Sequence, residues 1–442
     1  MSTQTETRAE TQTETIILHS VNSPIDRPPS NASQDQPIKW LYPKIISAGV
    51  SFFVAGVNDG SLGSLIPYII RDYNVSTNMV SIVYGTTFAG WLIAALSNSS
   101  MCQRLDLGLI LCIGAVLQII AHVLRAWLPP FPLYAVTFFL TSLGQAYNDT
   151  HANTFVSALR GTAHRWLGFI HAMYMAGCLV GPFVATGVAS ANAESKWNLF
   201  YIFPLGLGVV NLAFIGLSFH DSVKLLPRRD SGSSDQSQDH ASTRKTALGE
   251  IKATLATPGV WLLSLFFFFF LGATITAGGW MVEYLVNVRN GDVKNMGYVP
   301  AGFFGGAFLG RLILAEPTHR LGERRMIFIY AVLCVGLQLV FWLVPNIITE
   351  AVAVSLLGFF SGPFFATGIS VGSKIFVPEI RSSAIAFVFV LGQIGGSVFP
   401  AITGIMAAQV GVKVLQPMLV GLLSAAGISW LILPKNAEVH RD

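Results

Sequence analysis

Long apolar segments separated by short polar turns recur along the whole chain. About twelve of them are long enough to cross a bilayer, for which a helix needs about 20 residues. They lie at residues 44–70, 77–97, 107–128, 132–158, 166–190, 198–219, 259–287, 297–315, 325–345, 348–374, 382–408 and 413–433. The pattern therefore predicts an all-α membrane protein with twelve transmembrane helices in contact with the lipid bilayer.

One long polar segment interrupts this series between the sixth and seventh helices. Its Ser- and Asp-rich composition is typical of a flexible linker. We therefore predict two six-helix bundles, at residues 44–219 and 259–433, joined by a cytoplasmic linker at 220–258. Residues 1–43 form a polar tail without the apolar core of a cleavable signal peptide, and residues 434–442 form a second tail.

Composition agrees with this prediction and excludes several classes of protein. The chain is 52% hydrophobic and 11% charged, whereas soluble domains have about 25% charged residues. The net charge of +4 is modest and forms no basic stripe, so we expect no nucleic-acid partner. The four cysteines have neither paired nor metal-ligand spacing, so we expect no disulfide framework, metal or cofactor. A phosphate-binding Gly-rich loop and a nucleophile motif are both missing, so we expect no enzyme and no ATP-driven pump.

The distribution of Lys and Arg predicts that both termini are cytoplasmic. With that orientation, the inner loops contain Arg104, Arg160, Arg165, Arg311, Arg320, Arg324, Arg325, Lys374 and Arg381. The outer loops contain only Arg71, Arg125, Lys196, Arg289, Lys294 and Lys413. Positive residues favour the cytoplasmic side, so this bias supports the assignment.

The fourth helix contains a polar stripe in an otherwise apolar segment. Gln145, Asp149 and Asn153 are spaced four residues apart, so they share one helix face, with Asn148 beside it. A carboxylate at mid-membrane depth costs about 2.5–3.5 kcal/mol on insertion scales, so this face should line a protein interior or a wet cavity. Hydrogen bonding between helices is the alternative explanation, particularly for the two asparagines.

The first helix contains a second buried polar pair, Asn58 and Asp59. This pair lies roughly 22 Å along the helix axis from the predicted cytoplasmic end, past the membrane midplane. A helix-capping or interhelical hydrogen bond would explain both residues, and a titratable group in a cavity wall is the functional alternative.

The two halves repeat several features at matching positions. Small-residue faces occur in the fifth helix, at Gly177 and Gly181, and in the eleventh, at Gly392, Gly395 and Gly396. A basic turn follows the second helix of each half. It is weak in the first half, at Arg104, and strong in the second, where it comprises Arg311, Arg320, Arg324 and Arg325. Two parallel six-helix repeats are typical of a secondary transporter.

With these motifs the chain resembles the major facilitator superfamily, from about Lys44 to Pro434. Asn58-Asp59 followed by Leu65-Ile-Pro67, and Asp149-x3-Asn153-x-Phe155, are similar to the fucose/galactose/glucose–proton symporter group and its fungal relatives. So are the run from His171 to Gly177 and the seventh-helix pattern Gly272-x6-Gly279-Trp280. Thr274 and Ala366 depart from that group, which often has a Glu at the first place and a Pro at the second.

The resemblance implies roles for individual residues. Asp59 and Asp149 match the carboxylates that serve proton coupling and substrate binding in that group. The residues we expect to contact substrate are Asn58, Gln145, Asn148, Asn153, His171, Tyr174, Trp280 and Gln393. His171 has an alternative explanation as a hydrogen-bonded interior histidine. The five arginines of the basic turns are expected to form a cytoplasmic gate: Arg104, Arg311, Arg320, Arg324 and Arg325.

These features predict a proton-coupled transporter of a small organic solute, either a sugar-like compound or a fungal metabolite, which works by alternating access. Export by proton antiport, uncoupled facilitation and, outside the transporter class, a non-transporting membrane sensor remain alternatives. We expect a monomer in the plasma membrane, with the vacuolar membrane as the alternative. Solute and protons are the expected partners.

Overall fold

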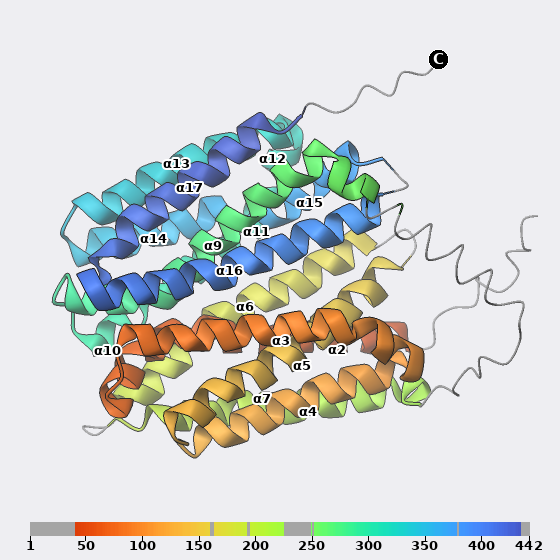
Figure 1. The fold of residues 1–442 in the computed structure, drawn as a ribbon, viewed down its shortest axis with the longest axis horizontal. Coiled ribbons are helices and arrows are strands. Elements are labelled where there is room, and N and C mark those ends of the chain that lie inside the picture. Colours follow the sequence, from red (N-terminus) through yellow and green to blue (C-terminus); the bar gives the residue numbers. More distant parts are fainter. Residues whose placement is uncertain are drawn as a thin grey trace, which may run out of the picture. The chain divides into compact units, whose positions relative to one another are not determined.

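The computed structural model describes residues 40–159, 163–191, 195–224, 249, 252–377 and 380–434. Its elements are helices and the turns between them (Figure 1). The first half contains α2 (Leu41–Tyr73), α3 (Thr77–Arg104), α4 (Leu107–Ala126), α5 (Phe131–Ser157), α6 (Ala163–Ser190), the short η1 (Trp197–Tyr201), α7 (Ile202–Ser218) and η2 (His220–Ser222).

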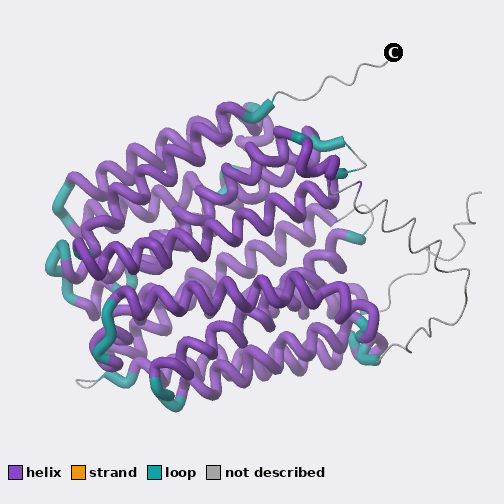
Figure 2. Tube along the Cα trace, viewed as in Figure 1, coloured by secondary structure: helices purple, strands orange, loops and turns teal. Residues whose placement is uncertain are grey.

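The second half repeats this series with more breaks. It contains α9 (Pro258–Asn287), α10 (Val293–Met296), α11 (Val299–Ile313), α12 (Ala315–Leu321), α13 (Glu323–Leu343), α14 (Ile347–Ser361), α15 (Phe364–Ile375), α16 (Arg381–Val410), η3 (Val412–Val414) and α17 (Leu415–Ile432). Turns gather at the two ends of the helices, as expected if the helices cross a bilayer (Figure 2).

Each of the twelve predicted segments corresponds to a helix or to a pair of helices in direct succession. Ten described helices are long and apolar enough to span a membrane, and an eleventh span consists of two pieces, residues 293–313 and 315–321, bent by 52°. The helix α5 is not among them because the polar stripe around Asp149 lowers its hydropathy. The tenth predicted helix is broken into α14 and α15 at Pro363, which supplies no backbone N–H.

Polar residues at several turns fix where helices begin. The Ser76 side chain accepts a hydrogen bond from the Met79 N–H at the start of α3, and Asn346 accepts from the Thr349 N–H at the start of α14. These side chains satisfy backbone donors that have no partner within the helix. The chain leaves α16 at Gly411, whose φ of 82° suits a residue without a side chain.

Within each half, small residues bring helices into backbone contact. A Cβ atom on Gly177 of α6 would lie 2.1 Å from the Phe53 carbonyl oxygen of α2. A Cβ atom on Gly395 of α16 would lie 2.0 Å from the Phe268 carbonyl oxygen of α9. Neither position has room for a side chain. The predicted small-residue faces of the fifth and eleventh helices are therefore packing interfaces at matching places in the two halves.

The two halves meet along α3 with α16 and along α6 with α11. We use "outer end" for the end that contains Tyr73 and Asn287, following the orientation predicted from the sequence. There the Ser64 hydroxyl donates to the Gly297 carbonyl at 2.8 Å, and the Thr77 hydroxyl donates to the Gly404 carbonyl at 2.9 Å. These bonds join one half to the other, so the interface between the halves is closed at the outer end.

One assignment from the sequence is wrong. Arg125, which we placed in an outer loop, is 1% exposed, and its side chain points into the first bundle from the last turn of α4. The predicted tails and linker fall mostly outside the described residues, at 1–39, 225–248, 250–251 and 435–442.

Candidate solute-binding cavity

A cavity of about 200 Å³ lies between the two halves. The first half contributes most of its polar wall, namely Asn58, Asp59, Ser142, Gln145, Asp149, Asn153, His171 and Tyr174. The second half contributes Thr274, Arg311, Gln393 and Ser397, together with apolar side chains that include Phe304, Phe365 and Phe389. The wall is therefore asymmetric, with both of its carboxyl groups on the first half.

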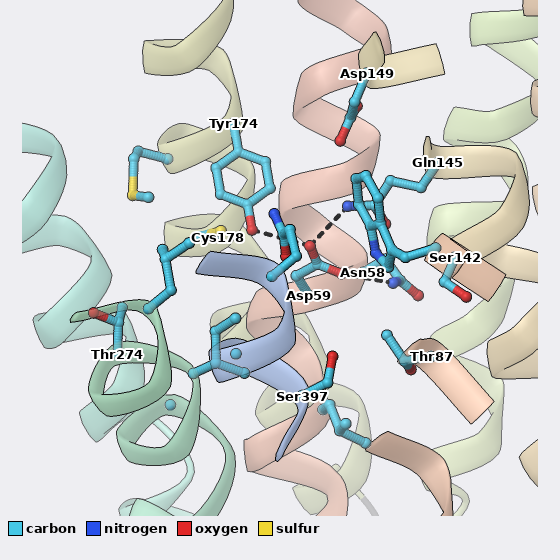
Figure 3. A pocket seen from close by; sticks show the side chains of 18 of the residues that line it. Asn58, Asp59, Thr87, Ser142, Gln145, Asp149, Tyr174, Cys178, Thr274 and Ser397 are labelled. Carbon is cyan, nitrogen blue, oxygen red and sulfur yellow. Dashed lines mark hydrogen bonds between the residues drawn. The ribbon is translucent and has the colours of Figure 1, made fainter. Parts of the chain in front are cut away.

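The carboxylate of Asp59 is the most extensively hydrogen-bonded group in this wall. Its Oδ2 accepts from Gln145 Nε2 at 2.8 Å and from the Tyr174 hydroxyl at 2.9 Å, and its Oδ1 accepts from Asn58 Nδ2 at 3.0 Å. Figure 3 shows Asp59 between Tyr174 and Gln145. All three donors are neutral, and Asp59 forms no ion pair within the described part of the chain.

Arg125 contacts Asp59 indirectly, through Asn58. Its Nη1 donates to Asn58 Oδ1 at 2.9 Å, while Nε and Nη2 donate to the hydroxyls of Thr137 and Thr141 at 2.8 and 2.9 Å. The guanidinium carbon also lies 3.6 Å from the centre of the Phe138 ring, in cation–π geometry. The Asn58 amide therefore bridges a buried cation and the cavity carboxylate.

Asp149 is in a different environment, although it belongs to the same wall. It is 9% exposed, and its Oδ1 has no hydrogen-bond partner. Gln145, one helical turn earlier on α5, donates its amide N–H to Asp59. Its side chain therefore lies between the two acids (Figure 3). Asn153 completes the stripe. The structure thus brings Gln145, Asp149 and Asn153 to one cavity wall, as their spacing predicts.

His171, Tyr174 and Gln393 also line the cavity. The His171 ring lies between the halves, with ring centres 5.3 Å from Phe52 and 5.4 Å from Phe365. Its ring neighbours are aromatic rather than acidic, so the histidine packs between the two halves as part of the cavity wall.

Two residues predicted to contact substrate lie elsewhere. Asn148 is 1% exposed and faces α4, where its Oδ1 would be 2.3 Å from a Cβ atom placed on Gly114. Trp280 is fully buried, and its indole N–H donates to the Pro400 carbonyl at 2.9 Å. Neither belongs to the cavity lining, because each packs against a neighbouring helix of its own half.

The five predicted gate arginines do not form one cluster. Arg320 pairs with Glu316 at 2.5 Å, one helical turn away, and Arg324 donates to carbonyls at the end of α17, which include that of Leu433. Arg104 and Arg325 are exposed. The contacts of Arg320 and Arg324 therefore lie within the second half, whereas Arg311 lines the cavity.

Sequence reasoning overlooked Arg125 and the side chains around it. A signal was present, because an arginine inside a segment otherwise composed of apolar residues must find polar partners. Its position near the end of the segment led us to count it among loop residues. Thr137 and Thr141, four residues apart on α5, are the partners that such a search would have found.

The arrangement presents hydrogen-bond donors and acceptors to the cavity, together with a carboxylate held by neutral groups. Within the described residues there is no group of three or more His, Cys, Asp or Glu side chains placed to bind a metal ion. A carboxylate held by neutral donors and accessible from a cavity can take up a proton without breaking an ion pair.

Comparison with known sequences identifies relatives over most of the chain. The chain is 26% identical over 423 residues to "Bypass of stop codon protein 6" of Saccharomyces cerevisiae, covering 90% of this chain and 84% of the yeast protein. It is 24% identical over 371 residues to the cis,cis-muconate transport protein of Acinetobacter baylyi, covering 80% and 86% of the two chains.

Solved structures share the fold at lower sequence identity. A D-xylose–proton symporter superposes with a TM-score of 0.70 and 13% identity, covering 90% of this chain and 98% of that one. The fucose:proton symporter of E. coli gives a TM-score of 0.61 and 15% identity, covering 90% and 99%. The twelve-helix fold in two bundles and the resemblance inferred from the sequence are confirmed.

The family model described as "Major Facilitator Superfamily" matches residues 48–354. This match extends from the first helix into α14, so it covers the first bundle and the first part of the second. Together with the apolar helices and the central cavity, it indicates a multi-pass membrane transporter rather than an enzyme. The chain belongs to the Major Facilitator Superfamily.

Proposed function

We propose that this transporter moves a small organic solute together with protons, by alternating access of the central cavity. One observation supports the coupling above all: the Asp59 carboxylate is accessible from the cavity and is held by three neutral donors. Such a group can change its charge with little rearrangement, whereas a carboxylate fixed by a direct ion pair would lose that pair on protonation.

Protonation would change the hydrogen bonds of the wall in a specific way. A charged Asp59 accepts bonds only, whereas a protonated one must also donate one. The Gln145 amide would then be released from Oδ2 and could turn toward Asp149, whose Oδ1 has no partner. Because like charges that share a site repel each other, a proton on either acid also removes the repulsion that acts on the other carboxylate.

Solute would contact the same side chains that respond to the proton. Gln145, Asn153 and Tyr174 offer donors and acceptors from the first half, and Gln393 offers both from the second. Coupling requires that proton and solute bias the same conformational equilibrium, and shared residues such as Gln145 provide that link. The closed outer end corresponds to one of the two states between which the halves would alternate.

The names of the relatives support a small organic solute. The Acinetobacter protein is named for cis,cis-muconate transport, and structural neighbours are symporters of D-xylose and fucose with protons. We propose the plasma membrane as the location and a monomer as the working unit. The two carboxyl groups favour import with protons, and the apolar second half of the cavity favours a moderately apolar solute.

Transport driven by an imposed proton gradient tests the coupling. Reconstituted vesicles receive labelled cis,cis-muconate, D-xylose or fucose, with and without an inside-alkaline pH gradient. We expect the wild type to accumulate solute only with the gradient. Asp149→Asn should abolish accumulation but retain exchange of solute for solute. Glu316→Gln, which neutralises an exposed acid outside the cavity, is the matched control and should accumulate solute normally.

Two results would change this proposal. Accumulation against a gradient by Asp149→Asn would remove Asp149 from the proton pathway. Equal fluxes of the wild type with and without the pH gradient would instead make the protein an uncoupled facilitator, in which Asp59 and Asp149 bind solute or stabilise the bundle.

A further inference from the structure

Arg311 is a half-buried cation in the cavity wall that has few protein partners. It lies on α11, lines the cavity, and crosses to the first half, where Nη1 donates to the His171 carbonyl at 3.3 Å. Its Nε is buried without a hydrogen-bond partner. Among described residues, no carboxylate forms an ion pair with it.

Arg125, which is buried, and Arg289, which is half-buried, show what a satisfied guanidinium looks like in this fold. Arg125 donates to three side chains and lies over an aromatic ring. Arg289 donates to the Glu350 carboxylate and to two backbone carbonyls. A guanidinium has five N–H donors, and Arg311 uses one of them in a long bond. Withdrawing Nε of a charged group from solvent without a partner is costly, and the residue lines the cavity, so the unused donors indicate a ligand there.

The surroundings of Arg311 favour a carboxylate as that ligand. The planar fork of a guanidinium binds a carboxylate through two parallel hydrogen bonds. Phe365 lies beneath the guanidinium at 6.0 Å, and the cavity wall of this half includes Phe304 and Phe389. One arginine among aromatic rings suits a single negative charge attached to an apolar body. A phosphate dianion would bring a second negative charge, and the described lining of the cavity contains no second lysine or arginine to balance it.

We infer that Arg311 is the anion-binding residue of the cavity and that the transported solute contains a carboxylate. This carboxylate accepts hydrogen bonds from the Arg311 N–H groups that do not donate to the His171 carbonyl. This inference rests on the proposed transport function and names the solute class for the same cavity. The carboxylate binds to the second half, while the rest of the solute reaches the acids and amides of the first. A carboxylate that moves with one proton carries no net charge, which fits a wall with Arg311 on one side and Asp59 on the other.

The local charge can be measured without knowing the solute. Phe365→Cys places a thiol in the cavity wall close to Arg311, whose guanidinium lies 6.0 Å from the Phe365 ring centre, in a variant whose four native cysteines are replaced. We compare its reaction rates with anionic sulfonatoethyl and cationic trimethylammonioethyl methanethiosulfonate. Arg311→Gln should lower the ratio of the anionic to the cationic rate about tenfold, as expected for loss of a nearby charge. Arg381→Gln, at an exposed arginine, should leave the ratio unchanged. An unchanged ratio in Arg311→Gln would overturn the inference.

Transport kinetics test the solute class itself. In reconstituted vesicles, the monomethyl ester of cis,cis-muconate, which has one carboxylate, serves as the acid probe, and the dimethyl ester is the neutral match. Arg311→Gln should raise the half-saturating concentration of the acid at least tenfold, and Arg311→Lys should raise it less, because a lysine keeps the charge but not the fork. Proton-coupled transport of a neutral solute with half-saturation unaffected by Arg311→Gln would overturn the inference and leave the proposed function intact. Carboxylate transport that needs Arg311 but moves no protons would overturn the proposed proton coupling and leave the inference about Arg311 intact.

Discussion

The closed outer end depends on a glycine contact between the two halves. A Cβ atom on Gly63 of α2 would lie 1.9 Å from the Gly278 carbonyl oxygen of α9. A backbone carbonyl cannot rotate out of the way as a side chain can. The substitution Gly63→Ala therefore forces α2 and α9 apart, and we expect it to open the outer end.

The size of the effect follows from the overlap. A methyl carbon and a carbonyl oxygen pack at about 3.4 Å, so the helices must separate by about 1.5 Å at this point. Overpacking of this kind costs roughly 1–3 kcal/mol. The cost applies only to the outer-closed state, because the contact is absent once the halves separate. The ratio of outer-open to outer-closed molecules should therefore rise by roughly 5- to 150-fold.

Distances between spin labels measure this ratio. Met79→Cys on α3 and Val410→Cys on α16 place labels on exposed positions at the outer end of the two halves. We expect Gly63→Ala to shift the distance distribution toward longer values. The matched control is Gly216→Ala on α7, where an added Cβ meets no atom within 4 Å, and its distribution should equal that of the parent.

A second glycine separates this effect from general loss of stability. Gly177→Ala introduces a similar overlap, with its Cβ 2.1 Å from the Phe53 carbonyl oxygen, but between two helices of the first half. It should lower the thermal unfolding midpoint without changing the distance between the labels. An unaltered distance distribution in a folded Gly63→Ala protein would refute our description of the outer closure.

Three further predictions concern buried polar contacts and pH. Asn58→Ala removes the bridge between Arg125 and Asp59 and should lower the free energy of unfolding by about 1.5–3 kcal/mol. In a double-mutant cycle measured by thermal unfolding, this loss should be smaller when Arg125→Met is already present, and additive losses would count against the bridge. Glu350→Gln removes the charge of a fully buried acid that pairs with Arg289, and should cost about 3 kcal/mol in the same assay, whereas a cost below about 1 kcal/mol would contradict a buried ion pair. The Lys44 ammonium, which donates to Asp221 at 2.7 Å, holds the pKa of this half-exposed acid below its ordinary value of 3.8. The pair therefore stabilises the fold at neutral pH by at most about 1 kcal/mol, and this stability is lost as the pH falls through the lowered pKa. Asp221→Asn should lower the unfolding midpoint slightly at pH 7 and not at pH 2, and a difference that persists at the low pH would contradict this explanation.

Helix periodicity predicted the cavity-facing stripe but not its boundaries. Gln145, Asp149 and Asn153 share one face of α5 by spacing alone, and all three line the cavity. Asn148 lies beside that face, and the sequence does not say which neighbour covers it. Gly114 has no side chain and leaves room on α4 for Asn148 to approach, so Asn148 packs there instead.

Tertiary contacts also decided the roles of Trp280 and Arg125. The indole N–H of Trp280 donates to Pro400, 120 residues away, and no local pattern reveals that bond. Arg125 was misassigned because we counted an arginine near the end of an apolar segment as a loop residue when we assigned the orientation from the charges. Its three side-chain acceptors come from α2 and α5, so only the packing of the first bundle identifies it as buried.

The most direct test of proton coupling is the external pH of a weakly buffered suspension of reconstituted vesicles during addition of solute. The panel contains cis,cis-muconate, its dimethyl ester, D-xylose and fucose, and wild type is compared with Asp149→Asn. We predict that one class of solute makes the external medium more alkaline with wild-type vesicles and leaves it unchanged with the variant. Solute uptake by the wild type with no change in pH would contradict the proton-coupled mechanism.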